Sequence, residues 1–119
     1  MLKVLIIDDN SDITGLLSRF LKSKGLENTV ATDPYEGLDL IKNEKFDAIL
    51  LDMSMPEFSG VDIIDSLDRD KILQDQKIII FSAISLTDNQ VQGLLKRPGI
   101  YDCLKKPLQL DKLLTAITC

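Results

Sequence analysis

The sequence contains no histidine, and this absence excludes several kinds of chemistry. A Ser-His-Asp or Cys-His catalytic site needs an imidazole base, and a His-ligated metal site needs an imidazole ligand. Cysteine is scarce as well: Cys103 and Cys119 are the only two, and they form neither a CxxC pair nor a metal-ligand spacing. A disulfide between them is not expected in a reducing compartment. Carboxylates, hydroxyls and amines remain as the candidate functional groups.

The sequence also lacks an excess of basic residues and a long apolar run at its start. It has 14 lysines and arginines against 19 acidic residues, which gives a formal net charge of −5. A nucleic-acid binder needs a basic face, and a membrane-surface patch needs clustered basic residues, so we expect no direct nucleic-acid partner and no membrane partner. The apolar run at residues 4–7 is too short for a signal peptide or a membrane span. These features predict a cytoplasmic protein.

The length of 119 residues is that of one ordinary domain, and we expect a single domain over residues 1–119. Short apolar runs alternate five times with segments of helical periodicity. We expect strands at residues 4–7, 28–32, 47–52, 77–82 and 100–104, and helices between Ser11 and Gly25, at 34–43, from 61, at 87–96 and at 108–118. This alternation predicts an α/β fold, a doubly wound five-stranded parallel sheet with helices on both faces. The charged connection 69–76 is expected to be exposed.

Polar residues follow four of the apolar runs. Asp8 and Asp9 follow the first run, Asp52 the third, Ser82 the fourth and Lys106 the fifth. In open α/β sheets, ligands bind just beyond the carboxyl ends of the strands. We therefore expect three carboxylates, one hydroxyl and one ammonium to converge at one edge of the sheet, where they would suit a cation and a phosphoryl group.

Three neighbouring carboxylates repel one another, and a hard divalent cation such as Mg²⁺ would relieve that repulsion. An aspartate is also able to act as a nucleophile and form an aspartyl phosphate. Ser82 would then donate a hydrogen bond to a phosphoryl oxygen, and Lys106 would pair with its charge. Taken singly, each residue is better explained as a turn residue, a helix cap or a solvated surface residue. Together they are not, because all of them are expected at one site.

These residues are similar to those of the receiver domain of two-component response regulators, and the resemblance extends over the whole chain. The matching motifs are Ile6-Ile7-Asp8-Asp9-Asn10, Leu50-Leu51-Asp52-Met53-Ser54-Met55-Pro56, Phe81-Ser82-Ala83 and Lys105-Lys106-Pro107, and the single residue Gly60 matches as well. The separations fit too, with 43 residues from Asp9 to Asp52, 30 from Asp52 to Ser82 and 24 from Ser82 to Lys106. One motif alone would be weak evidence, but four motifs in order are specific.

The resemblance implies a role for each matched residue. Asp52 is the implied phosphoacceptor, and the implied ligands of Mg²⁺, or of Mn²⁺, are Asp9 directly, Asp8 through a water, Asp52, and the backbone carbonyl of Ser54. The implied phosphate-contacting and switch residues are Ser82, Ala83 and Lys106, with Pro107 after a cis peptide bond and with Pro56 and Gly60 in the loop after the acceptor. The implied fold is flavodoxin-like, with strand order 2-1-3-4-5.

The function implied is a phosphorylation-controlled signalling switch that resembles standalone, chemotaxis-type receivers. A histidine kinase or a phosphotransfer protein would donate the phosphoryl group, and a downstream protein would read the result by contact, with the chain a monomer or weak dimer. It would not be an enzyme beyond intrinsic Mg²⁺-dependent self-phosphorylation and dephosphorylation. The chain would act as a separate protein or as a piece of a larger one.

Two other functions are compatible with parts of this pattern. A phosphohydrolase of the haloacid-dehalogenase type also uses an aspartate nucleophile, but it needs a second Asp two residues later, where this chain has Ser54. A receiver-like scaffold that never accepts phosphate is disfavoured, because all the required groups are present.

The sequence departs from the receiver pattern at Cys103, three residues before Lys106. Many receivers have an aromatic residue there, which turns inward when the switch hydroxyl moves. We interpret Cys103 as a small, half-buried packing residue, and we expect weaker coupling to the hydroxyl. Tyr101 is expected to face the same side of the strand as Cys103, because side chains alternate along a strand.

Overall fold

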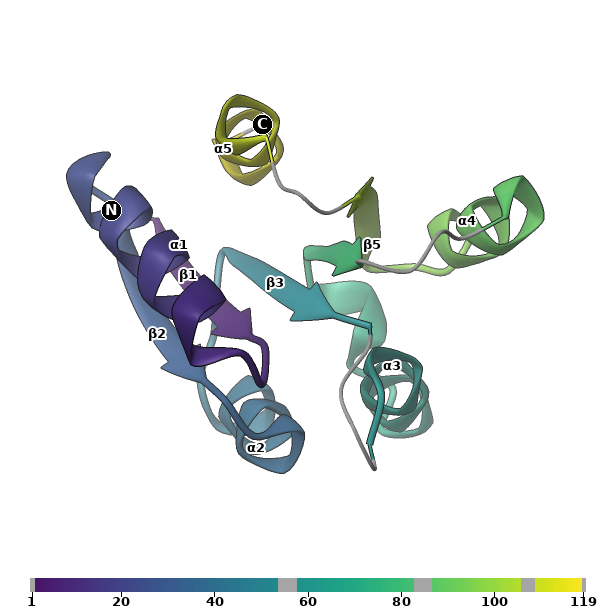
Figure 1. Cartoon of the computed structure of the whole chain (residues 1–119). Helices are drawn as coiled ribbons and strands as arrows, with labels where there is room; N and C mark the ends of the chain where they lie inside the picture. The colour runs from purple at the N-terminus through teal and green to yellow at the C-terminus, as the bar shows by residue number, and fades with distance from the viewer. Residues whose placement is uncertain (1, 54–57, 83–86, 106–108, 119) are drawn as a thin grey trace.

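The computed structural model describes residues 2–53, 58–82, 87–105 and 109–118. Five parallel strands form one sheet in the order β2-β1-β3-β4-β5, and helices alternate with the strands along the chain (Figure 1). The elements are β1 (Lys3–Ile7), α1 (Ser11–Ser23), β2 (Glu27–Ala31), α2 (Pro34–Asn43), β3 (Ala48–Asp52), α3 (Gly60–Arg69), the 3₁₀ turn η1 (Leu73–Asp75), β4 (Ile78–Ser82), α4 (Asp88–Leu95), β5 (Ile100–Lys105) and α5 (Leu110–Thr118). The predicted fold class and strand order are confirmed.

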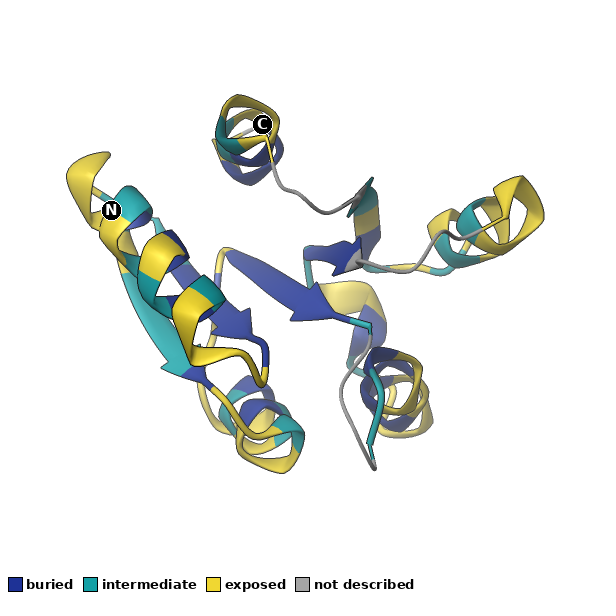
Figure 2. Ribbon diagram, in the orientation of Figure 1, coloured by how far each residue is buried: buried dark blue, intermediate teal, exposed yellow. Residues whose placement is uncertain are grey.

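The sheet separates two hydrophobic layers. On β1, Leu5 and Ile7 face the layer that α2 and α3 cover, whereas Val4 and Ile6 face the layer that α1 and α5 cover. All five residues of β3 are buried, because β3 is the central strand and has helices on both faces (Figure 2). A strand that is buried on both faces reads as a continuous apolar run, which is why the sequence pattern revealed it.

Local capping signals start the first two helices. The Asn10 side chain accepts a hydrogen bond from the Asp12 N–H at 2.9 Å and so caps α1. Asp33 caps α2 by accepting from the Tyr35 N–H at 2.8 Å, and Pro34 occupies the first turn, so α2 begins where the sequence predicted a helix over 34–43. Gly25 follows the end of α1 with a φ of 76°, a conformation that favours glycine.

The connection between α3 and β4 differs from the sequence prediction. Residues 69–76 were expected to be exposed, yet Leu73 in η1 is fully buried in the layer beneath α2 and α3. The sequence pattern did not indicate that this leucine is buried, because the segment is mostly charged and one apolar residue in a short 3₁₀ turn produces no periodicity. The expectation of an exposed connection was therefore wrong for Leu73.

Strand β5 contains an irregularity that also overturns a prediction. Ile78 pairs with Ile100, but Ile79 pairs with Asp102, so the register between β4 and β5 skips one residue at Tyr101. Such a bulge breaks the alternation of side chains. Tyr101 lines a cleft of about 330 Å³ against α5 together with Leu104, whereas Cys103 packs against the layer on the other face. Tyr101 and Cys103 thus face opposite sides of the sheet, and the expected shared side was wrong.

Candidate acidic site at the carboxyl edge of the sheet

Three aspartates meet where β1 and β3 end. Asp52 is the last residue of β3, and Asp8 follows Ile7, the last residue of β1. Ile7 pairs with Leu51 in register, so Asp8 and Asp52 come next to each other. One carboxylate oxygen from each of Asp8, Asp9 and Asp52 lies within 4.8 Å of the others. The predicted convergence of the three carboxylates is confirmed.

The three carboxylates differ in their access to solvent. Asp8 is 0% exposed and Asp52 is 2% exposed, whereas Asp9 lies on the surface. Asp8 also accepts a hydrogen bond through Oδ1 from the Asn10 N–H at 3.0 Å, which fixes it at the start of α1. The site therefore has two acids at its base and one at its rim. A set of oxygen donors with one open side suits Mg²⁺, which binds through a few carboxylates and keeps several waters.

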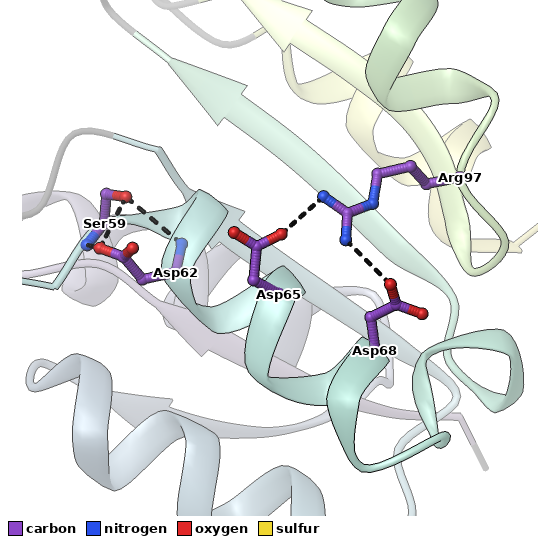
Figure 3. Close-up of polar contacts among 5 residues, drawn as sticks. All are labelled: Ser59, Asp62, Asp65, Asp68 and Arg97. Atoms are coloured by element: carbon purple, nitrogen blue, oxygen red, sulfur yellow. Dashed lines mark hydrogen bonds and ion pairs between the residues drawn. The ribbon is translucent and has the colours of Figure 1, made fainter.

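Helix α3 begins directly against the backbone of Asp52. A Cβ atom on Gly60 would lie 2.8 Å from the Asp52 carbonyl oxygen and 2.6 Å from Met53 Sδ, so only glycine fits without a shift. Ser59 caps the same turn, because its hydroxyl accepts from the Asp62 N–H while the Asp62 carboxylate accepts from the Ser59 N–H (Figure 3). Gly60 was predicted in the loop after Asp52, and the structure gives it a packing role at the first residue of α3.

An aromatic pair near this edge was not predicted from the sequence. Tyr35, in the first turn of α2, stacks on Phe58, which precedes α3, with ring centroids 4.7 Å apart. The contact joins α2 to the segment that returns from Asp52. No spacing in the sequence signals it, because the two residues come together only once both βα connections are placed at one edge.

Some predicted site residues lie outside the described part of the chain. Ser82 ends β4 one position beyond Phe81, the register partner of Asp52, which brings its backbone to the same edge. The described part of the chain does not include the side chain of Ser82. It also does not include the residues Ser54, Pro56, Ala83, Lys106 and Pro107. Their assigned roles stay predictions.

Cys103 is a half-buried residue that packs against the core layer under α2 and α3, as the sequence interpretation proposed. Burial raises the pKa of its thiol, and the carboxylate of Asp102 raises that pKa further. A thiol that keeps its proton is a poor nucleophile, so Cys103 behaves as a packing residue at neutral pH.

None of the described helices is both long enough and apolar enough to cross a membrane.

Comparison with known proteins agrees with this geometry. The transcriptional regulatory protein YxdJ of Bacillus subtilis is 40% identical over 58 residues, which cover 49% of this chain and 25% of YxdJ. The Francisella response regulator 1452 receiver domain superposes with a TM-score of 0.87 at 32% identity over 99% of this chain and 94% of that one. Thermotoga maritima TrrA, in complex with Mg²⁺ and BeF, superposes with a TM-score of 0.83 at 25% identity over 99% and 97% of the two chains. Residues 4–118 match the response regulator receiver domain family, and the chain belongs to that family.

Proposed function

We propose that Asp52 accepts a phosphoryl group and that Asp8, Asp9 and Asp52 hold the Mg²⁺ ion that this transfer needs. The observation that supports the proposal best is the cluster of three carboxylates within 4.8 Å at the ends of β1 and β3. When bound, Mg²⁺ would neutralise part of the carboxylate charge and of the incoming phosphoryl charge. Mn²⁺ has the same ligand preference and is proposed as a substitute.

Asp52 is the best-placed acceptor of the three because β3 is the central strand of the sheet. On one side of Asp52 lie the acids that follow β1, and on the other side lies the end of β4 with Ser82. An oxygen of the Asp52 carboxylate would form a bond to phosphorus as the bond between phosphorus and the donor's nitrogen breaks. The donor's imidazole nitrogen then takes up a proton as the leaving group.

Receiver domains partner with histidine kinases. For this chain, we propose a histidine kinase or a phosphotransfer protein as the donor and a downstream protein as the reader. Spontaneous Mg²⁺-dependent loss of the phosphoryl group and the monomer or weak-dimer state belong to the same proposal. The cytoplasmic location stays a prediction from the sequence.

Acetyl phosphate with MgCl₂, followed by intact-mass measurement, tests the acceptor. One added phosphoryl group is expected, it should be labile to hydroxylamine as an acyl phosphate is, and it should be absent in Asp52→Asn. Asp33→Asn is the matched control, because it makes the same change at the same edge while an asparagine still caps α2. An adduct that survives in Asp52→Asn would place the chemistry elsewhere.

The same assay separates the other two functions. A phosphohydrolase would release phosphate from varied phosphate esters without a lasting adduct, and a scaffold would give neither an adduct nor turnover. Either result would overturn the proposal.

A further inference from the structure

Helix α4 has little hydrophobic attachment to the rest of the protein. None of its eight residues is buried, whereas five of the ten residues of α3 are. Among the described residues, Leu94 is the α4 residue that packs against the core layer under α2 and α3, and it is only partly buried. Figure 2 shows the contrast, with α4 drawn in exposed and intermediate colours. Burial of apolar surface therefore contributes little to holding α4 in place.

One side chain just beyond α4 joins it to α3. Arg97 Nη1 lies 2.8 Å from Asp65 Oδ1, and Nη2 lies 3.5 Å from Asp68 Oδ2 (Figure 3). The two aspartates are three residues apart, so α3 presents both on one face. A guanidinium has two donor edges in a rigid plane and is suited to contact two carboxylates at once.

The backbone next to Arg97 is held as well. Gly99 has a φ of 86°, and a Cβ atom there would collide with the carbonyl oxygen of Leu73 in η1. The Gly99 carbonyl accepts a hydrogen bond from the Ile78 N–H at 2.7 Å, which joins it to β4. The C-terminal end of α4 is thus fixed through both a side chain and the turn that leads into β5.

The N-terminal end of α4 is held differently. The Thr87 hydroxyl accepts from the Gln90 N–H at 3.2 Å, and Gln90 Oε1 accepts from the Thr87 N–H at 2.9 Å. These contacts lie within the helix itself, and residues 88–90 are exposed. This end also lies on the side of the sheet where β4 ends at Ser82, next to the acidic site.

We propose that Arg97, with Asp65 and Asp68, fixes the C-terminal end of α4 and makes that end the pivot about which α4 moves when Asp52 is phosphorylated. The trigger rests on the function proposed above, but the ion-pair clamp between α3 and α4 does not. A change at the site reaches the N-terminal end of α4 first, where the described residues 87–90 are exposed and their cap contacts lie within the helix. The clamp at the other end then turns that change into a rotation of the helix instead of its detachment.

Amide hydrogen exchange in the unmodified protein tests the clamp. In Arg97→Gln, the Lys96 and Arg97 amides, which bond to the carbonyls of Gln92 and Leu94, should exchange roughly fivefold faster, as expected for loss of an exposed ion-pair network. Lys96→Gln makes the same charge change on the neighbouring exposed residue and should leave exchange nearly unchanged. Salt at about 1 M, where the screening length is about 3 Å, should speed exchange in the wild type but not in Arg97→Gln.

Amide NMR shifts with Mg²⁺ and beryllofluoride, a phosphoryl mimic, test the pivot. In the wild type, shift changes should be larger at residues 87–91 than at Lys96 and Arg97, and in Arg97→Gln they should extend to the C-terminal end. If Arg97→Gln does not fold, Arg97→Lys replaces it. Lysine keeps the charge but lacks the two donor edges of the guanidinium, so the expected changes in exchange and in chemical shift are intermediate between those of the wild type and those of Arg97→Gln.

Equal exchange rates in Arg97→Gln and Lys96→Gln would overturn the clamp. Wild-type shifts as large at Arg97 as at residues 87–91 would overturn the pivot alone. A complete lack of response to beryllofluoride would overturn the pivot together with the proposed function, while the exchange rates would still decide whether the clamp exists.

Discussion

Helices α3 and α4 start with the same local device but occupy different environments. Each is capped by a reciprocal box, formed by Ser59 and Asp62 in α3 and by Thr87 and Gln90 in α4. Yet α3 lies against the sheet with half of its residues buried, whereas α4 has none buried. A capping box thus determines where a helix begins, but it does not by itself determine how firmly the helix is held against the rest of the protein.

The difference comes from the residues that follow each cap. Helix α3 places Ile63, Ile64 and Leu67 on one face, and all three are fully buried. Helix α4 has Gly93 in its interior, which costs a helix about 1 kcal/mol relative to alanine, and its apolar residues are only partly covered. Segments with few buried contacts open locally at low free energy, and moving elements are drawn from such segments.

Truncating one apolar side chain in each helix should give the largest expected effect, which is a difference between the two losses in free energy of unfolding. Ile64→Ala removes a fully buried side chain and should lower the free energy of unfolding by about 2–5 kcal/mol. Leu94→Ala removes a partly buried one and should cost about 1 kcal/mol. Urea unfolding of both variants measures the two values. Equal costs would mean that α4 is held as firmly as α3 and would remove the basis of the comparison.

Mg²⁺ should increase the difference in stability between α3 and α4, because the acidic site adjoins the start of α3. An ion that binds only the native state stabilises it by about 2.7 kcal/mol at a hundredfold excess over Kd. Asp9→Asn should remove most of this gain in melting experiments at matched ionic strength. Amide exchange in α4 should stay nearly unchanged, since its local opening leaves the three carboxylates in place. A melting temperature that does not depend on millimolar Mg²⁺ would contradict the site.

The sheet and the acidic site were predictable from the sequence because both depend on short-range patterns. Buried parallel strands appear as apolar runs, and the polar residue after each run lies at the carboxyl edge by topology alone. The proximity of Asp8, Asp9 and Asp52 could therefore be predicted from the sequence alone. The bounds of α2 were predicted because Asp33 and Pro34 mark its start locally.

Features that depend on a partner far along the chain were not predictable. The bulge at Tyr101 is defined by its register against β4, and strand alternation alone placed that side chain on the wrong face. The stack of Tyr35 on Phe58 and the contact of Arg97 with α3 join segments whose distance follows only from the fold. Charge content made residues 69–76 look exposed, although Leu73 anchors them.

Removing each cap tests whether the same device has different consequences in the two helices. Ser59→Ala and Thr87→Ala each remove one capping acceptor, a change that costs about 0.5–2 kcal/mol in helices. In α3 the cost should appear in the global free energy of unfolding, because α3 unfolds with the core. In α4 it should appear mainly as faster exchange of α4 amides. A fully global cost for Thr87→Ala would show that α4 unfolds together with α3.

The smallest expected effect is a pH dependence of the free energy of unfolding that comes from Cys103. This residue packs against the same core layer as Leu94. Burial, with a further contribution from Asp102, raises the pKa of this thiol above its usual value of 9.0, so the folded state favours the protonated form. Its contribution to stability is then fully present below pH 9 and is lost as pH rises through the raised pKa of the folded state. Relative to Cys103→Ala, the wild type should lose stability between neutral pH and pH above 9, when the difference in free energy of unfolding is measured by urea at each pH. Both proteins should carry Cys119→Ala, so that Cys103 is the only thiol compared. The same alkaline loss in both proteins would mean that β5 beside α4 admits enough water to solvate the thiolate, and that the loose packing of α4 extends to the strand beneath it.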